Sequence, residues 1–135
     1  MRLRLILGLT VACGMVFTLS AWSHHAHGNY TVETVDMEGI VTEVHLLSPH
    51  SFVYLEVTNA NGTKRMWALE ASSKPQLERL GVNATYIKTG DKIKTRCHPL
   101  KDGGPGCLLG FVKGADGTVK DWDGINDAQQ LPKDF

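Results

Sequence analysis

The stretch SFVYLEVTNANGTKRMWAL, residues 51–69, decides the fold of this chain, because it reads as two β-strands joined by a tight turn. In its first half the side chains alternate between two faces, as they do in a strand: Val53, Leu55 and Val57 on one face, and Phe52, Tyr54 and Glu56 on the other. The tetrapeptide Asn-Ala-Asn-Gly at 59–62 is typical of a hairpin turn, since Asn and Gly tolerate positive φ angles. We therefore predict strands over 51–58 and 63–69 that pair as a hairpin.

A further strand is predicted before this hairpin. Residues 40–46 alternate in the same way after Gly39, and the turn signal Ser48-Pro49 ends the pattern. The first three strands are thus expected to form a meander.

A change of period follows the hairpin and predicts one short helix. Ser72 or Ser73 can cap it, Pro75 lies in its first turn, and Gly81 is its stop signal. A helix of barely two turns is not stable alone, so we expect it to cover one end of the sheet. Three more strands are predicted after it, over 92–98, 107–112 and, briefly, 118–122.

This order of elements indicates the fold class. Three strands, a helix and then further strands are the order of the OB-type barrel, a five-stranded and partly open Greek-key design. We predict a mainly β protein, with a small five- to six-stranded OB-like barrel and one short helix between strands three and four. A plain β-sandwich with a helical insertion is the competing architecture.

The first 23 residues have the composition of an export signal. Arg2 and Arg4 form a cationic start, 5–19 is a mostly apolar run, and Ala21-Trp22-Ser23 places small residues where signal peptidase accepts them. Cleavage is therefore predicted before His24, with the mature protein in the periplasm or secreted. An uncleaved anchor is the competing interpretation, although an apolar run of about 15 residues is shorter than the ~20 that span a bilayer.

Lipidation of Cys13 is a second alternative, but no leucine stands three residues before this cysteine and the apolar run continues past it. We expect no stable membrane insertion after cleavage. The chain is accordingly divided into four parts: a signal peptide at 1–23, a histidine-rich N-terminal segment at 24–38, an OB-like β domain at 39–122 and a polar C-terminal tail at 123–135.

The charge balance argues against nucleic acid as a partner. The chain has 14 Lys and Arg against 14 Asp and Glu, and loss of the signal removes two arginines and no acids. The mature net charge is then −2, with 12 basic residues that are spread along the sequence. Binding to a phosphate backbone requires a concentrated positive patch. We therefore expect no nucleic-acid partner, and an unknown protein or small molecule instead.

Export would leave Cys97 and Cys107 in an oxidising compartment, where we predict that they pair. If the segment between them is a hairpin loop, their sulfurs face each other from neighbouring strands. Closing a loop of about ten residues would contribute roughly 2 to 3 kcal/mol. The alternative is that Cys97, His98 and Cys107 are metal ligands.

The histidines are the best candidates for chemistry, because neutral imidazole is a common ligand of copper and zinc. With cleavage before His24, the α-amino nitrogen and the ring of that residue would chelate one metal ion, as in a histidine brace. We predict a copper or zinc site there, with further ligands among four other histidines: His25, His27, His50 and His98.

Other interpretations of these histidines stay open. A cut one residue earlier, before Ser23, would make His25 the third residue and offer a square-planar nitrogen site suited to Cu(II). The terminal histidines are also explained as a flexible polar end without a role. His50 would then hold its turn through a hydrogen bond to a carbonyl, and His45 would be an exposed or half-buried strand residue.

Aromatic residues offer a second kind of site. Phe52, Tyr54 and Trp67 would form a binding face of the barrel, as aromatics do on OB barrels. Core packing is the competing explanation, above all for Trp67 beside Leu69. No pair of carboxylates, phosphate loop or nucleophile motif indicates catalysis, so the sequence does not predict an enzyme.

Several short motifs in a fixed order resemble one known family, the DUF6152 family of small exported bacterial proteins. They are His24-His25, the run from Gly39 to Val44, Ser48-Pro49-His50, Trp67-Ala68-Leu69-Glu70, Gly90-Asp91-Lys92-Ile93 and His98-Pro99. The resemblance implies an exported small domain and no established activity. The chain departs from the family pattern at Ser48, where Asn is usual, and in the cysteine pair.

Taken together, the sequence predicts an exported, non-enzymatic binding or accessory domain that binds copper or zinc through N-terminal histidines. The alternative function is a barrel module that binds a protein or a small molecule without metal.

Overall fold

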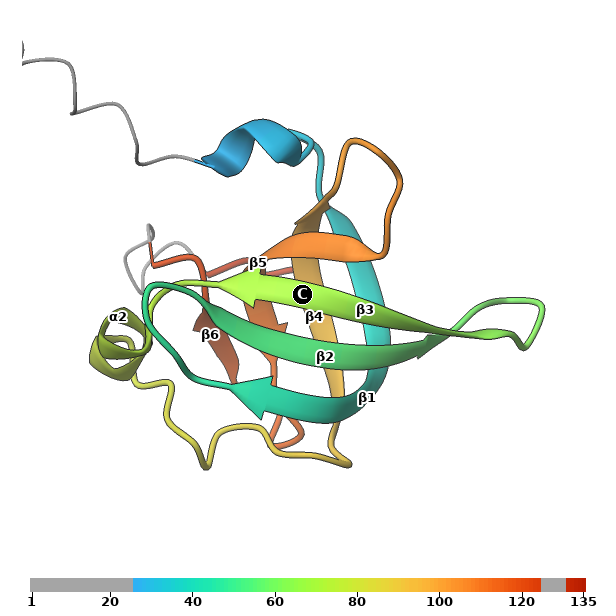
Figure 1. The fold of residues 1–135 in the computed structure, drawn as a ribbon. Coiled ribbons are helices and arrows are strands. Elements are labelled where there is room, and N and C mark those ends of the chain that lie inside the picture. The colour runs from blue at the N-terminus through green and yellow to red at the C-terminus, as the bar shows by residue number, and fades with distance from the viewer. Residues whose placement is uncertain (1–25, 125–130) are drawn as a thin grey trace, which may run out of the picture.

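In the computed structural model, which describes residues 26–124 and 131–135, six strands form one sheet (Figure 1). The elements follow each other in this order: η1, a short 3-10 helix (Ala26–Asn29), β1 (Val35–His45), β2 (Ser51–Thr58), β3 (Lys64–Ala71), α2 (Lys74–Arg79), β4 (Lys92–Pro99), β5 (Gly106–Lys113) and β6 (Val119–Asp121).

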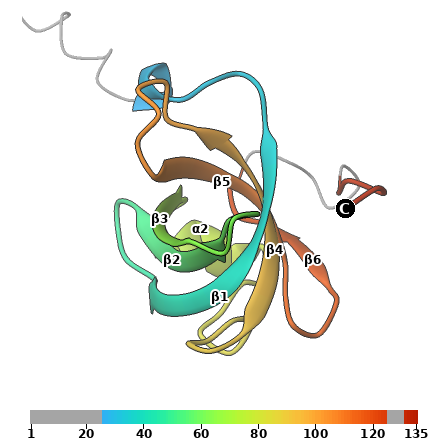
Figure 2. The same ribbon diagram turned by 90° about the vertical axis from the view of Figure 1, so that its right-hand side faces the viewer.

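The sheet closes into a barrel. Its strand order is β3-β2-β1-β4-β5-β6, and β3 also pairs with β5 in parallel, so the first five strands form a closed ring (Figures 1 and 2). Together with the helix between β3 and β4, this is the OB-type arrangement. The predicted fold class is therefore confirmed, and the sandwich alternative is excluded because one continuous sheet encloses the core.

The interior is built from alternate residues of the strands. Val53 and Leu55 of β2 are fully buried, as the alternation in residues 51–58 predicted. β1 begins at Val35, five residues before the predicted strand, and a bulge between Val41 and Glu43 interrupts its alternation. As a result, Ile40 lies on the outer face, 40% exposed, whereas Val44 four positions later packs against the core.

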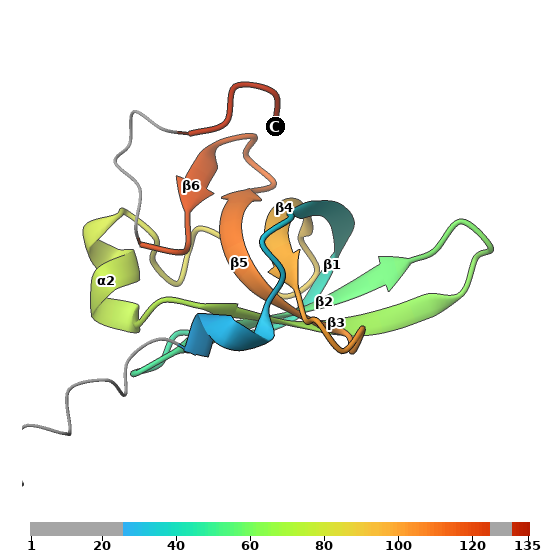
Figure 3. The same cartoon turned by 90° about the horizontal axis from the view of Figure 1, so that it is seen from above.

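One end of the barrel is closed by apolar side chains from outside the main strands. Trp122, directly after β6, is the largest fully buried side chain of the described residues, and Leu77 of α2 is buried with it in the same core. The ring of Tyr86 lies 6.4 Å from that of Trp122. The short helix α2 thus covers one end of the sheet, as predicted (Figure 3).

Gly39 allows β1 to cross β2 closely. A Cβ atom at this position would lie 2.5 Å from the carbonyl oxygen of Glu56 and 2.7 Å from Leu55 Cγ. Only a residue without a side chain fits there.

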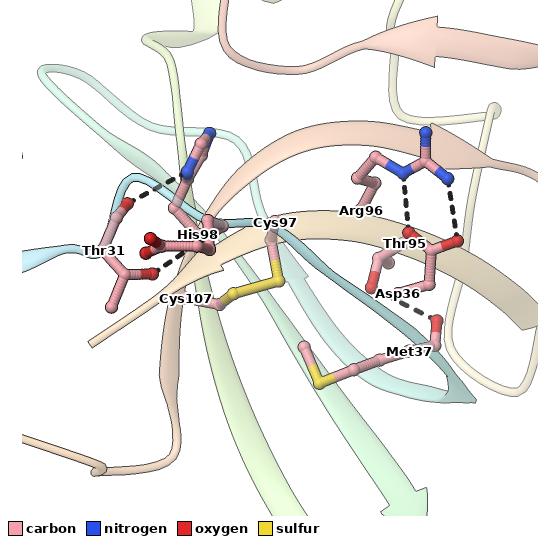
Figure 4. The surroundings of a disulfide bond; sticks show 9 residues. Thr31, Asp36, Met37, Thr95, Arg96, Cys97, His98 and Cys107 are labelled. Carbon is pink, nitrogen blue, oxygen red and sulfur yellow. Dashed lines mark hydrogen bonds and ion pairs between the residues drawn. A yellow bond between two sulfur atoms is a disulfide. The ribbon is translucent and has the colours of Figure 1, made fainter. Parts of the chain in front are cut away.

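The two cysteines are bonded to each other. The sulfur atoms of Cys97 in β4 and Cys107 in β5 are 2.09 Å apart, and both residues are completely buried (Figure 4). The predicted disulfide is therefore present, and these sulfurs are not thiolate ligands of a metal. The alternative site of Cys97, His98 and Cys107 is overturned for that reason.

Candidate functional site

Glu70 lies at the centre of a polar cluster on the outer face of the barrel. Its neighbours in β3, Leu69 and Ala71, are buried, so the carboxylate points outward. One carboxylate oxygen, Oε2, accepts a hydrogen bond of 2.6 Å from the hydroxyl of Tyr30. The other, Oε1, lies 3.0 Å from Nδ1 of His50. A single carboxylate thus joins two segments that are far apart in the sequence.

Each partner of Glu70 is positioned by its own local structure. His50 follows the cis peptide bond between Ser48 and Pro49 and directly precedes β2. Tyr30 forms an isolated bridge with Leu100, so the segment that precedes β1 lies beside the loop between β4 and β5.

The Tyr30 hydroxyl is held in its protonated form. Burial raises its pKa most, and the hydrogen bond to Glu70 and the negative charge of that carboxylate raise it further. A tyrosine that stays protonated remains a donor, so Glu70 keeps the role of acceptor. The side chain of Glu70 is 20% exposed and that of His50 is 51% exposed, so the histidine is the accessible member of the cluster.

A second histidine, His98, has the same kind of support. Its Nδ1 lies 3.0 Å from the backbone carbonyl oxygen of Thr31 (Figure 4). A carbonyl oxygen only accepts, so Nδ1 carries the hydrogen and the neutral ring keeps its lone pair on Nε2. His50 Nδ1 faces a carboxylate oxygen, which also only accepts. In the neutral ring of His50, Nδ1 therefore carries the hydrogen and Nε2 keeps the lone pair. Among the described residues, neither Nε2 atom has a hydrogen-bond partner.

This arrangement is the one that metal-binding histidines commonly have. Such a histidine donates one ring nitrogen to a carboxylate or a backbone carbonyl, which fixes the tautomer and leaves the other nitrogen for the metal. Two consecutive residues of the N-terminal segment take part in holding these histidines. Tyr30 binds Glu70, the partner of His50, and Thr31 binds His98 directly. The N-terminal segment therefore connects the two histidines.

The described part of the chain does not assemble a complete metal site. Within it, no group of three or more His, Cys, Asp or Glu side chains is placed to hold a metal ion. His24 and His25 lie outside the described residues, and so does the side chain of His27, whose backbone belongs to η1. His45 is paired with Glu43 of its own strand at 2.8 Å. Of the predicted ligands, the structure thus brings only His50 and His98 to the N-terminal segment.

The predicted aromatic face is divided between two sides of the sheet. Phe52 and Tyr54 lie half-buried on the outer face of β2, with ring centroids 6.5 Å apart. Trp67 pairs with Leu55 on the inner face and packs partly against the core. The guanidinium group of Arg65 covers its ring at 5.4 Å. Phe52 and Tyr54 therefore form the accessible aromatic pair, and Trp67 does not join them.

Sequence reasoning missed the part that Tyr30 has in this cluster. The residue stands 40 positions from Glu70 and outside the predicted strands, so no periodicity connects the two. Its place next to the histidine-rich stretch was the only available signal. The register of β2 against β3, which sets Phe52 opposite Glu70, is what brings His50 to the same carboxylate.

Comparison with known families agrees with the motifs of the sequence. A family model described as "Family of unknown function (DUF6152)" matches residues 12–109. The chain belongs to the DUF6152 family. No curated protein matches the sequence of this DUF6152 chain.

Two solved structures are similar to the fold of this DUF6152 protein. Both are crystal structures of the mitochondrial single-stranded DNA binding protein Rim1 from S. cerevisiae, one of them labelled with selenomethionine. They are 10% and 9% identical to this chain, with TM-scores of 0.47 and 0.45, and each match covers 61% of this chain and 92% of the other. The fold assignment rests on the strand order above.

These structures correct one prediction. Nucleic acid was excluded on charge balance, yet the similar solved structures are those of single-stranded DNA binding proteins, so the exclusion was wrong. The physical reason is that a net charge summed over a sequence does not fix how charges are distributed on a folded surface. On β4, for example, Lys92, Lys94 and Arg96 all lie on the outer face, where Lys92 is paired with Glu38 and the other two with Asp36. The likeness assigns no ligand to this DUF6152 chain.

Over residues 26–124 and 131–135, none of the helices is long and apolar enough to cross a membrane.

Proposed function

We propose that this DUF6152 protein is an exported domain that binds copper or zinc. The ligands are the N-terminal histidines His24, His25 and His27, together with His50 and His98 of the barrel. The observation that carries this proposal is the contact of 3.0 Å between His50 Nδ1 and Glu70 Oε1, which leaves Nε2 of a half-exposed histidine as a ready ligand.

The position of the N-terminal segment supports the proposal. The hydroxyl of Tyr30 donates to Glu70, which supports His50, and the carbonyl oxygen of Thr31 supports His98 directly. His27 is three positions before Tyr30 and His24 six, and an extended chain reaches at most about 20 Å over six residues. The chain is therefore long enough for the terminal histidines to reach His50, and this attachment would lower the entropic cost of collecting the ligands.

Export is part of the proposal. The signal-like composition of 1–23 supports cleavage before His24, which would supply a free α-amino nitrogen as an additional ligand. A buried disulfide is consistent with an oxidising compartment such as the periplasm. The segment before β1 then bears the terminal ligands, the barrel that begins with β1 at Val35 supports them, and residues 123–135 form a tail. No catalytic role is assigned to any residue.

The test is a titration of the exported protein, with its native first residue verified by intact mass, against Cu(II) and Zn(II) by calorimetry. We expect one ion per chain, and about tenfold weaker binding or more for His50→Ala and for Glu70→Gln. His45→Ala is the matched control, because His45 is also half-exposed on the outer face and also bound to a carboxylate. Binding that is unchanged in both His24→Ala and His50→Ala would overturn the proposal.

A second function is favoured by a different observation. Phe52 and Tyr54 lie on the same outer face as Met66, which is 44% exposed, and Ile40, which is 40% exposed. This surface suits a protein or small-molecule partner that buries apolar area without metal. Binding of such a partner would be lost in Tyr54→Ala and retained in His50→Ala, whereas metal binding shows the reverse pattern.

A further inference from the structure

A groove lies away from the cluster around Glu70, between the end of β1, the helix α2 and the segment that leads from α2 to β4. Figure 1 shows this segment, in yellow, passing the end of β1. The groove has a volume of about 570 Å³, which falls within the range of small-molecule sites. Residues of β1 supply part of its apolar lining, α2 supplies charged side chains, and the segment from α2 to β4 supplies both kinds.

The floor of the groove is apolar. Ile87 is only 2% exposed and belongs to the core, and Val44 and Leu46 at the end of β1 are partly buried and pack against that core. Ala84 adds a small side chain to the same lining. A ligand must therefore offer apolar surface to this floor, since a strongly hydrated group would lose water there without a hydrogen-bond partner.

The rim of the groove carries two lysines with weakly engaged ammonium groups. Nζ of Lys74 lies 3.9 Å from Glu78 Oε1, and Nζ of Lys88 lies 3.4 Å from Asp91 Oδ1. Both distances exceed the 2.7–2.9 Å that is usual for a charge-assisted hydrogen bond. The two side chains are 51% and 75% exposed, so both are free to turn toward a ligand.

The remaining polar side chains of the rim are already used within the protein. Asn83 Oδ1 accepts hydrogen bonds from the amide and the hydroxyl of Thr85, and the hydroxyl of Thr89 donates to the carbonyl of Thr42. These contacts shape the wall. The charged groups of the lining are the two ammonium groups and the carboxylate of Glu78, which gives the lining an excess of one positive charge.

We propose that this groove binds a small amphipathic carboxylate, with its aliphatic part on Val44, Leu46 and Ile87 and its carboxylate between Lys74 and Lys88. The apolar floor selects the aliphatic part, and the rim selects the sign of the head group. The site shares no residue with the proposed metal ligands, since His50, His98 and Glu70 do not line the groove.

The test uses decanoate as the probe and decylammonium as its counterpart of opposite charge. Calorimetry and amide chemical shifts of the full protein are expected to show decanoate bound in the groove, with the largest shifts at Ala84 and Ile87, and weaker binding of decylammonium. Equal binding of the two probes, or shifts confined to other surfaces, would overturn the proposal.

Variants divide the contributions of rim and floor. Lys74→Gln combined with Lys88→Gln is expected to weaken decanoate binding about tenfold, as two partly exposed charge contacts would. Lys64→Gln is the matched control, because Lys64 is an exposed lysine paired with Glu56 on the β2–β3 hairpin. Leu46→Gln is expected to weaken decanoate binding without changing the preference for a negative head group. An unchanged affinity in the double lysine variant would contradict the assignment.

A membrane surface offers the same combination of apolar chain and anionic head group. Vesicles of phosphatidylglycerol therefore form a separate arm of the experiment. Binding of free decanoate with no binding to the vesicles supports a small-molecule site. Binding to the vesicles alone would overturn it in favour of a lipid surface.

Discussion

The inner and outer faces of β2 and β3 differ in chemistry although they share the same strands. On the inner face, Val53, Leu55 and Leu69 have no exposed surface. On the outer face, Tyr54 and Glu70 are half-buried and contact aromatic or polar partners. One step along the sequence thus separates a residue that stabilises the barrel from a residue that is available to a ligand.

The two faces also contribute different amounts to stability. Burial of a large aliphatic side chain contributes about 1.5–3 kcal/mol, and its removal leaves a cavity that adds to the loss. Contacts between partly exposed polar groups compete with water and contribute about 1 kcal/mol or less each. Substitutions on the inner face are therefore expected to unfold the domain, and substitutions on the outer face to change binding first.

The largest effect is expected from a pair of neighbouring substitutions in β2. Leu55→Ala removes a completely buried side chain and is expected to lower the free energy of unfolding by about 3 kcal/mol. Tyr54→Ala removes an outer ring stacked on Phe52 and is expected to lower it by less than about 1 kcal/mol. Urea denaturation measures both. Equal losses would mean that the two faces of β2 are not distinct.

The disulfide gives the next largest effect, and it belongs to the inner face. Cys97→Ala combined with Cys107→Ala removes a link that closes a loop of sequence separation 10, and we expect a loss of roughly 2 to 3 kcal/mol. Denaturation of the oxidised protein, the reduced protein and the double variant measures it. The reduced protein should resemble the double variant, and a loss below about 1 kcal/mol would show that strand pairing and packing hold β4 against β5 without the disulfide.

How well the sequence predicted the inner and outer faces of a strand depends on how regularly its apolar and polar residues alternate. β2 was placed at residues 51–58, as the structure has it, because its alternation is complete. β1 was placed five residues too late, because Val35 to Glu38 are exposed or half-buried and carry no apolar period. Those residues are strand because β4 pairs with them, which is a tertiary cause. The bulge after Val41 lies in the pairing of β1 with β2, which is also a tertiary feature.

The candidate site was less predictable than the fold for a related reason. Cys97 and Cys107 are close in sequence and are joined by a turn, so their pairing followed from local reasoning. Tyr30, His50 and Glu70 come from three separate segments, and their meeting requires the register of β2 and β3 and the bridge between Tyr30 and Leu100. Residue types alone indicated His50 and left its carboxylate support undetermined.

A smaller effect is expected on the outer face where β1 pairs with β4. The guanidinium group of Arg96 binds both carboxylate oxygens of Asp36, at 2.7 and 3.0 Å, and this hydrogen bonding holds the pKa of Asp36 below its usual range (Figure 4). A lowered pKa contributes stability above the unfolded value of about 4, and the contribution is lost as the pH falls through the folded value.

Asp36→Asn should therefore lower the free energy of unfolding at neutral pH and have no effect in acid. The side chain of Asp36 is 34% exposed, so after allowance for solvent screening we expect a loss of about 1 kcal/mol. Urea denaturation across the acidic range measures the difference between the two proteins. A difference that persists at the lowest pH would show that the cost is steric rather than electrostatic.

The smallest effect on stability is expected at Glu70, where the outer face is most specialised. Glu70→Gln removes the negative charge beside Tyr30 and weakens the acceptor, so the pKa of Tyr30 should fall toward its usual range of about 10. It should stay above that range, because burial is the largest cause of the shift and the variant keeps it.

A raised tyrosine pKa contributes stability that is complete below the unfolded value of about 10 and is lost as the pH rises through the folded value. The wild type should therefore lose more stability than the variant in strong alkali. Ultraviolet titration of tyrosinate, with Tyr30→Phe to identify the signal, measures the shift. An unchanged titration in Glu70→Gln would mean that the carboxylate does not hold Tyr30. The connection from the N-terminal segment through Glu70 to His50 would then be contradicted as well.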